Sequence, residues 1–150
     1  MRVAVGSDHA GFIIKGTVIK AIQEAGHEPI DFGTMNLDRV DYPDYAEKVG
    51  KAIINGKADR GIAICGSGVG VCIAANKING IYAGLISDVY SAHQGVEHDE
   101  MNVLCLAGLI IGPALAREIV VSFLNAKPMG EARYKKRIDK IKLIEKEYSK

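Results

Sequence analysis

The stretch Gly61-Ile62-Ala63-Ile64-Cys65-Gly66-Ser67-Gly68-Val69-Gly70 passes from a short apolar run into a glycine-rich loop. An apolar run of this length, without polar alternation, predicts a strand that is buried on both faces. Runs of the same kind predict further strands near Arg2–Gly6, Pro29–Phe32, Tyr82–Ile86 and Asn102–Leu106. Because segments of helical period separate these runs, the sequence predicts an α/β fold, a three-layer α/β/α Rossmann-like sandwich around a parallel sheet of about five strands.

Several of the intervening segments carry helix start and stop signals. An apolar stripe that ends at Gly26 comprises Ile14, Val18, Ala21 and Ala25. A second helix is predicted from Pro43 to near Gly56, and another from Pro113 to Asn125. Proline is favoured in the first turn of a helix and glycine just past its end, which is why these residues mark the boundaries.

The C-terminal stretch combines regular apolar spacing with many charges. Apolar side chains recur every three or four residues within Glu131 to Lys150, at Tyr134, Ile138, Ile141, Ile144 and Tyr148. This spacing predicts an amphipathic helix over about 131–149, appended to the sheet, that packs on its own subunit or is exchanged across a dimer interface. Since no repeat or linker interrupts the chain, residues 1–150 are expected to form a single domain.

Composition narrows the class of partner. The 150 residues carry 19 Lys and Arg against 18 Asp and Glu, and this net charge of +1 offers no general attraction to nucleic acid or to a membrane surface. No apolar run approaches membrane-spanning length and the first residues lack a signal-peptide core, so we expect a cytoplasmic protein. The 3 cysteines match neither zinc pairs nor a disulfide framework, which fits a reducing compartment. A small-molecule ligand is therefore expected.

Reactive side chains follow the predicted strands. In open parallel sheets, ligands bind beyond the carboxyl ends of the strands. The strand ends lead into Ser7-Asp8-His9-Ala10-Gly11, Cys65–Gly70 and Ser87-Asp88, while Glu97-His98-Asp99 precedes the fifth strand. His9 and His98 each adjoin an aspartate that can orient an imidazole for proton transfer, whereas a lone loop histidine is more often simply solvated. We interpret both histidines as functional residues that share a place at the sheet ends.

The glycine loop favours an anion and a reactive thiol. Alternating glycines let the backbone bend closely around a ligand, and a helix beginning near Val69 would aim amide donors at it. The same amides would favour the thiolate form of Cys65, which works as a base or a nucleophile. Other glycine-loop chemistries do not fit, because Val71 stands where a dinucleotide fingerprint needs glycine and a thiol phosphatase needs arginine, and no Gly-Lys-Ser or Gly-Lys-Thr is present.

Each candidate also has a structural or alternative interpretation. Cys65 could be a buried cysteine at a strand end, which is the interpretation we adopt for Cys72 and Cys105. Arg133 and Arg137 would face one side of a helix and clamp a phosphate, or form a solvated basic face. No helical HxxxH spacing supports a metal site. One such site nevertheless stays open, formed by Asp8, His9, His98 and Asp99.

Together these residues resemble the ribose-5-phosphate isomerase B and galactose-6-phosphate isomerase family over almost the whole chain. The resemblance rests on Gly6-Ser7-Asp8-His9-Ala10-Gly11, Asp31-Phe32-Gly33-Thr34, Asp41-Tyr42-Pro43, Ile64 to Gly70 followed by Ile73-Ala74-Ala75-Asn76-Lys77, and Asn102-Val103-Leu104. It implies aldose–ketose isomerisation of a phosphorylated sugar through an enediolate, without a metal or an organic cofactor. Ribose 5-phosphate is the first expectation for the substrate.

The resemblance also implies roles for particular residues. Cys65 matches the base that moves a proton between C1 and C2, and His98 matches the acid/base that opens the furanose ring. Ser67 and the amides of Gly66 to Gly70 match the groups that stabilise the enediolate oxygen. Substrate contacts are implied for Asp8, His9, Tyr42, Gly66, Gly68, Val69, Gly70, Asp99, Arg133 and Arg137. Family members form homodimers, some paired into tetramers, and the second subunit completes each active site.

Four positions depart from the family pattern. Asp99 stands where the ribose-phosphate enzymes usually carry Asn, and Leu109 where many members have a phosphate-binding arginine. Tyr134 replaces a usual histidine and Val96 an arginine. Losing one charge-assisted contact typically costs about 1.5–3 kcal/mol of binding free energy. The identity of the substrate therefore stays open between ribose 5-phosphate, a tetrulose 4-phosphate, allose and galactose 6-phosphate. A non-catalytic sugar-phosphate-binding domain and a metal-dependent isomerase are the rival classes.

Overall fold

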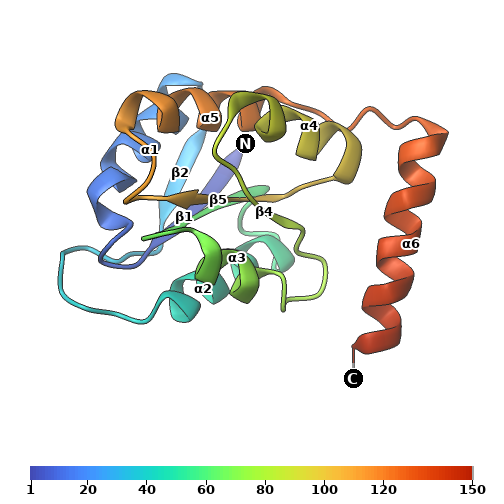
Figure 1. Ribbon diagram of the computed structural model, residues 1–150, viewed down its shortest axis with the longest axis horizontal. Coiled ribbons are helices and arrows are strands. Elements are labelled where there is room, and N and C mark those ends of the chain that lie inside the picture. The colour runs from blue at the N-terminus through green and yellow to red at the C-terminus, as the bar shows by residue number, and fades with distance from the viewer. Residues whose placement is uncertain (150) are drawn as a thin grey trace.

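The computed structural model describes residues 1–149, in which strands and helices alternate around one sheet (Figure 1). The strands are β1 (Arg2–Ser7), β2 (Glu28–Asp31), β3 (Arg60–Cys65), β4 (Ala83–Leu85) and β5 (Val103–Ala107). All run parallel in a 5-stranded sheet of order β2-β1-β3-β5-β4. The predicted α/β fold is confirmed, and each strand end lies no more than a residue from its predicted place.

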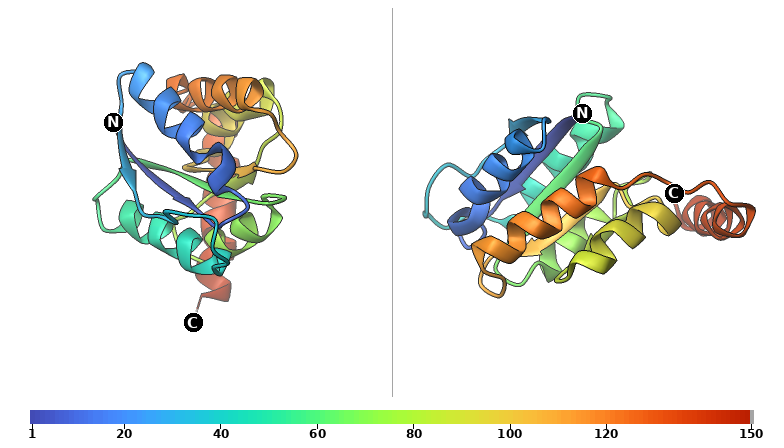
Figure 2. Two further views of the ribbon diagram at one scale, coloured as in Figure 1. Left: turned by 90° about the vertical axis from the view of Figure 1, so that its left-hand side faces the viewer. Right: turned by 90° about the horizontal axis from the view of Figure 1, so that it is seen from above.

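Helices cover both faces of the sheet. α1 (Phe12–Glu24), α4 (Val89–Asp99) and α5 (Pro113–Asn125) lie on one face, and α2 (Tyr42–Ile54) and α3 (Val69–Ala75) lie on the other (Figure 1; Figure 2). The predicted stop signals are confirmed at Gly26 and Gly56, which follow α1 and α2 with φ values of 81° and 68°. Glycine ends these helices because it adopts the left-handed backbone conformation without steric cost.

An apolar layer fills the space on each side of the sheet. Side chains alternate along β3, so that Ile62 and Ile64 pack toward α1 and α5, whereas Ala63 and Cys65 pack toward α2 and α3. The first layer contains large side chains such as Phe123, and the second contains mainly alanine, valine and cysteine. This near-continuous burial of both faces explains why the strands read as apolar runs.

The order in which strands are added to the sheet reverses between β1 and β3. α1 leads from β1 to the outer strand β2 over one face, and α3 leads from β3 toward β4 over the other. The carboxyl ends of these two strands are neighbours, because Ser7 pairs with Ile64 in the parallel ladder. Such a switch point is where open α/β sheets bind their ligands. The fold therefore brings the segments 7–11 and 65–70 together.

α6 (Ala132–Tyr148) stands apart from the three layers (Figure 1). Its Tyr134 and Ile138 are buried, and its Glu145 accepts a hydrogen bond from Gly80 N at 2.7 Å. Another set of its apolar side chains is exposed, namely Ile141, Leu143, Ile144 and Tyr148. The appended helix is thus confirmed, although Lys150 lies outside the described residues. Its exchange across a dimer interface and the single-domain assignment stay predictions.

None of the helices within residues 1–149 combines the length and the apolar character that crossing a membrane requires.

Candidate functional site

Cys65 is the last residue of β3 and lies at the switch point of the sheet. Its side chain faces the layer formed with α2 and α3 and is 4 % exposed. On its other side, Ala107 of β5 is its partner in the parallel ladder. The backbone that carries the thiol is therefore held by β5, at the sheet edge where the loop to α3 begins.

The loop after Cys65 needs glycine at two positions. Gly68 has a φ of 76°, and a Cβ there would lie only 3.1 Å from the Leu106 carbonyl oxygen. A Cβ on Gly70 would lie 2.6 Å from ring atoms of Tyr42, so the Tyr42 ring packs directly on the Gly70 backbone. Protein groups therefore approach the loop backbone closely at these two positions, while the close approach of a ligand stays a prediction.

The first turn of α3 offers amide donors beside Cys65. α3 begins at Val69, and the amides of Gly70 and Val71 have no carbonyl partner within the helix. Val69 N donates to the Ser67 hydroxyl oxygen at 3.4 Å, a long contact that a bound oxyanion could replace. These groups can stabilise a negatively charged oxygen close to the thiol.

Asp8 and His9 follow β1 and complete this group of side chains. Asp8 is 6 % exposed, and its Oδ1 accepts a hydrogen bond from Gly11 N at 2.9 Å. Asp8 N donates to Ile64 O at 3.1 Å, which ties the two strand ends together. Val40 N donates to His9 Nδ1 at 3.3 Å, so the His9 ring carries its hydrogen on Nε2. Asp8, His9, Tyr42 and residues 65–70 are called the switch-point cluster below.

One side of the switch-point cluster is apolar. Leu109 Cδ1 lies 3.3 Å from the position of a Cβ on Gly66, and the Leu109 side chain is 65 % exposed. The residue that stands in place of the usual family arginine therefore lies at the rim of the glycine loop. No positive charge reaches the loop from this position.

Three of the remaining predicted residues, His98, Arg133 and Arg137, lie together near the end of α4. Gln94 Nε2 and His98 Nδ1 are 2.8 Å apart, and the His98 ring stacks on Tyr134 of α6 with centroids 4.0 Å apart and planes at 12°. The guanidinium carbons of Arg133 and Arg137 lie 4.6 Å and 5.9 Å from the Tyr134 ring centroid. These five residues are called the His98 cluster below.

The two clusters lie at opposite edges of the sheet. α4 leads from the carboxyl end of β4 back to the amino end of β5, so His98 and Asp99 lie at the amino edge, whereas Cys65 ends β3 at the carboxyl edge. A strand of this length spans roughly 16 Å. The expectation that His9 and His98 lie at the same edge of the sheet was therefore wrong within one chain. A helix that connects two parallel strands runs back to the edge at which both strands begin.

The metal site that the sequence left possible is not formed within one chain either. Asp8 and His9 lie at the carboxyl edge of the sheet, whereas His98 and Asp99 lie at the amino edge. Across residues 1–149, no three His, Cys, Asp or Glu side chains gather so that they could hold a metal ion.

One buried charge near the switch-point cluster was missed in the sequence. The Lys15 side chain is only 4 % exposed, and its Nζ lies 2.9 Å from Asp31 Oδ2 and also donates to the Thr34 carbonyl. This pair anchors the start of the segment 32–41, which carries the amide that bonds to His9. The available signal was a lysine on the apolar side of α1, where a solvated lysine would be out of place.

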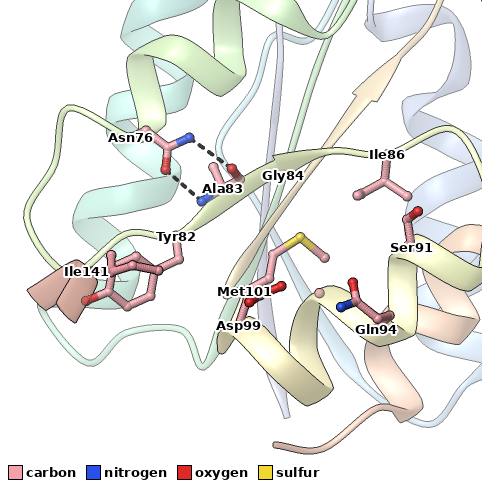
Figure 3. A pocket seen from close by; sticks show the side chains of 11 residues that line it. Asn76, Tyr82, Ala83, Gly84, Ile86, Ser91, Gln94, Asp99, Met101 and Ile141 are labelled. Carbon is pink, nitrogen blue, oxygen red and sulfur yellow. Dashed lines mark hydrogen bonds between the residues drawn. The ribbon is translucent and has the colours of Figure 1, made fainter. Parts of the chain in front are cut away.

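A cavity of about 380 Å³ lies along β4 rather than at Cys65 (Figure 3). Gln94 and Asp99 of α4 line it together with Met101, and Asn76 closes another part of it by bonding both to Ala83 N and to Ala83 O at 2.9 Å. Asp99 therefore faces the β4 side of the chain and does not meet Cys65 within one subunit.

The other two cysteines lie behind the loop, and none of the cysteines within residues 1–149 forms a disulfide. A hydrogen bond with Cys105 lowers the pKa of the Cys72 thiol to about 7, against the opposing effect of burial. The same hydrogen bond, together with burial, raises the pKa of Cys105. Cys105 is a core residue as predicted, whereas Cys72 is only half-buried. The cytoplasmic location inferred from the cysteines stays a prediction.

Comparison with known proteins identifies the family. Residues 3–141 match the family model described as Ribose/Galactose Isomerase. The chain belongs to the ribose/galactose isomerase family. The resemblance inferred from its motifs is therefore confirmed over nearly the whole chain.

Relatives within this family match the chain from end to end. Ribose-5-phosphate isomerase B of Escherichia coli (strain K12) is 43% identical over 144 residues, which cover 96% of each chain. The structure of Clostridium thermocellum ribose-5-phosphate isomerase B matches with a TM-score of 0.95 and 43% identity, over 99% of this chain and 100% of that one. Ribose-5-phosphate isomerase B from Mycoplasma genitalium with bound ribulose-5-phosphate matches with a TM-score of 0.90 and 38% identity, over 97% of both chains. The family member described here is an enzyme of the aldose–ketose isomerase class.

Proposed function

We propose that this isomerase interconverts ribose 5-phosphate and ribulose 5-phosphate by proton transfer through an enediolate. The observation that carries the proposal is the position of Cys65 at the carboxyl end of β3, next to the unpaired amides of the first turn of α3 and to Asp8 and His9. A pentose phosphate as substrate is supported by the ribulose-5-phosphate bound to the Mycoplasma genitalium relative.

Cys65 is the proposed base. Its thiolate takes the proton from C2 of the aldose and returns it to C1, while the proton of the C2 hydroxyl moves to the C1 oxygen. The electrons stay within the substrate, so no redox cofactor takes part. Ser67 and the amides between Gly66 and Gly70 stabilise the charge on the enediolate oxygen, because they follow Cys65 directly and the one contact among them, Val69 N to Ser67 Oγ, is long enough to be replaced.

The sugar hydroxyls are proposed to meet Asp8, His9 and Tyr42. Asp8 uses Oδ1 for Gly11 N, and its second carboxylate oxygen is left for the sugar. His9 can donate through Nε2, because Val40 N occupies Nδ1. These contacts would orient C1 and C2 over Cys65.

We further propose that each active site is shared within a homodimer, which can pair into a tetramer. In this arrangement a second copy supplies His98 to open the furanose ring, Asp99 to contact the sugar, and Arg133 and Arg137 to bind the phosphate. The proposal is supported by the separation of the two clusters across the sheet, which one chain cannot bridge. The exposed apolar side chains of α6 supply surface that a second copy would cover.

A kinetic panel tests the substrate. We expect kcat/KM to be highest for ribose 5-phosphate among aldoses of four to six carbons, each measured with and without phosphate. Leu109→Arg should raise kcat/KM for phosphorylated sugars by about tenfold and leave free sugars unchanged, because it adds one charge-assisted contact at the rim of the loop. A higher kcat/KM for a tetrose phosphate, allose or allose phosphate, or galactose 6-phosphate would reassign the substrate.

The rival classes are tested separately. Cys65→Ala should lower kcat by at least about 10²-fold while substrate still binds in calorimetric titration, because the change removes only a thiol. Full residual activity would refute Cys65 as the base, and an inactive wild-type protein that still binds sugar phosphate would favour the non-catalytic domain. Loss of turnover after exhaustive chelation, with recovery on adding a divalent metal, would favour the metal-dependent isomerase.

A further inference from the structure

The His98 ring is held through its Nδ1 atom. Gln94 lies one helical turn before His98 on α4, and its Nε2 donates to His98 Nδ1 at 2.8 Å. A neutral imidazole carries one hydrogen, so a ring whose Nδ1 accepts a hydrogen bond carries that hydrogen on Nε2. The opposite nitrogen is thereby prepared as a donor.

Stacking fixes the plane of the same ring. The His98 and Tyr134 ring centroids are 4.0 Å apart and the planes differ by 12°. Tyr134 is itself held in place, because it is 7% exposed and its hydroxyl accepts a hydrogen bond from Arg133 Nη2 at 2.7 Å. Turning the His98 ring over would lose the Gln94 bond while the stack stays, so the two contacts together select one orientation.

His93 provides a contrast on the same helix. Its Nδ1 lies 3.0 Å from Glu97 Oε2, with the same spacing of four residues. A carboxylate only accepts, so the His93 ring must carry a hydrogen on Nδ1. The two histidines of α4 therefore have opposite partners at Nδ1, and they are expected to differ in where the hydrogen lies.

We propose that Gln94 is a positioning residue that, with Tyr134, presents His98 to the sugar as an Nε2–H hydrogen-bond donor rather than as a base. This inference rests on the proposed function of His98 in ring opening. It assigns a role to a residue, Gln94, that lies outside the predicted site.

The chemistry of ring opening explains why a donor is useful. The C1–O4 bond of the furanose breaks and its electron pair goes to O4, while the C1 hydroxyl becomes a carbonyl. One proton passes from O1 to O4 through water, and nothing is oxidised or reduced. A donor aimed at O4 stabilises the charge that develops on the leaving oxygen, without giving up its own proton.

Nitrogen-15 NMR of the histidine rings tests the orientation without any turnover. In the wild-type enzyme, His98 should show an unprotonated Nδ1 and a protonated Nε2, and His93 should show a protonated Nδ1. His98→Asn identifies the His98 signals among those of the 4 histidines. In Gln94→Glu, the new carboxylate accepts at Nδ1, so a hydrogen should appear there. A wild-type His98 ring with its hydrogen on Nδ1 overturns the inference.

Kinetics test whether the orientation matters. Gln94→Leu and Gln94→Glu should each lower kcat/KM for ribose 5-phosphate by about fivefold to tenfold, the effect of losing one orienting hydrogen bond. The aldotetrose 4-phosphate has no furanose form, because its O4 carries the phosphate, and its turnover should not change. Gln23→Leu, on an exposed position of α1, is the matched control and should leave both substrates unaffected.

The outcomes separate the inference from the function on which it rests. If no sugar phosphate is isomerised, the proposed function fails, while the NMR signals still decide the position of the hydrogen. If ribose 5-phosphate is isomerised and the Gln94 variants keep wild-type kcat/KM, the positioning role is refuted and the proposed function stands.

Discussion

The proposed sharing of each active site between two chains predicts how inactive variants behave when they are combined. Cys65→Ser removes the proposed base and His98→Asn removes the proposed ring-opening group, so each homodimer should lose at least about 10²-fold in kcat/KM. In a mixed dimer, one site joins the intact Cys65 of one chain to the intact His98 of the other, and the second site carries both changes. Combining two inactive proteins should therefore restore activity.

The size of the recovery follows from the geometry. A purified mixed dimer should have about half the wild-type activity, and a random equimolar mixture about one quarter, because a symmetric dimer has two equivalent sites. Within one chain, β3 holds Cys65 at one edge of the sheet and α4 holds His98 at the other, roughly 16 Å away along the strands, so a complete site needs both chains.

Two affinity tags make the experiment direct. The variants are expressed together with different tags, the mixed dimer is purified on both columns in turn, and isomerisation of ribose 5-phosphate is followed. Cys65→Ser combined with Ser67→Ala is the matched control, because both changes lie in the switch-point cluster and damage one site each. Its activity should stay at the mean of the two parents. Activity no higher than that mean for the Cys65 and His98 pair would show that both residues serve one site from the same chain.

Three further predictions concern the surroundings of the switch-point cluster. Because the Cys72 pKa is lowered to about 7, its thiolate is present above that pH, and the rate of its alkylation by iodoacetamide should fall as the pH drops through 7. A midpoint of the alkylation rate near pH 9.0, or unchanged labelling in Cys72→Ser, contradicts this prediction. Lys15→Met should lower the free energy of unfolding by about 1–3 kcal/mol in urea titrations, since the Asp31 side chain, 28% exposed, loses its partner; an unchanged midpoint would mean that water replaces the lysine. Gly70→Ala should displace the Tyr42 ring and lower kcat/KM by about tenfold with little change in stability. The control Gly16→Ala, with no atom within 4 Å of the new methyl group, should leave kcat/KM unchanged. Equal kinetics of the two variants would show that Tyr42 is not part of the site.

Much of the fold could be predicted because its signals are local. Each buried strand is an apolar run, and Pro113, Gly26 and Gly56 mark helix ends through their own backbone preferences. The carboxyl ends of parallel strands always meet at one edge, so the neighbourhood of Asp8 and Cys65 followed from recognising the strands.

The His98 cluster shows what local signals do not contain. That His98 precedes β5 was visible, but its place at the amino edge depends on the direction in which α4 returns across the sheet. Its stacking on Tyr134 brings α4 into contact with α6, which follows only after α5 and a further connection. Lys15 pairs with Asp31 only because α1 packs beside β2.

The sequence by itself determined the α/β class, the strands, the glycine loop with its thiol and the family. Only the tertiary structure decided that the predicted site residues divide between two edges of the sheet and that Gln94 and Tyr134 hold the His98 ring. The physical reason is the distance along the chain over which the deciding interactions act. Strand burial and turn conformation are set by residues adjacent in the chain, whereas the neighbours of His98 and Lys15 are set by how separate elements pack.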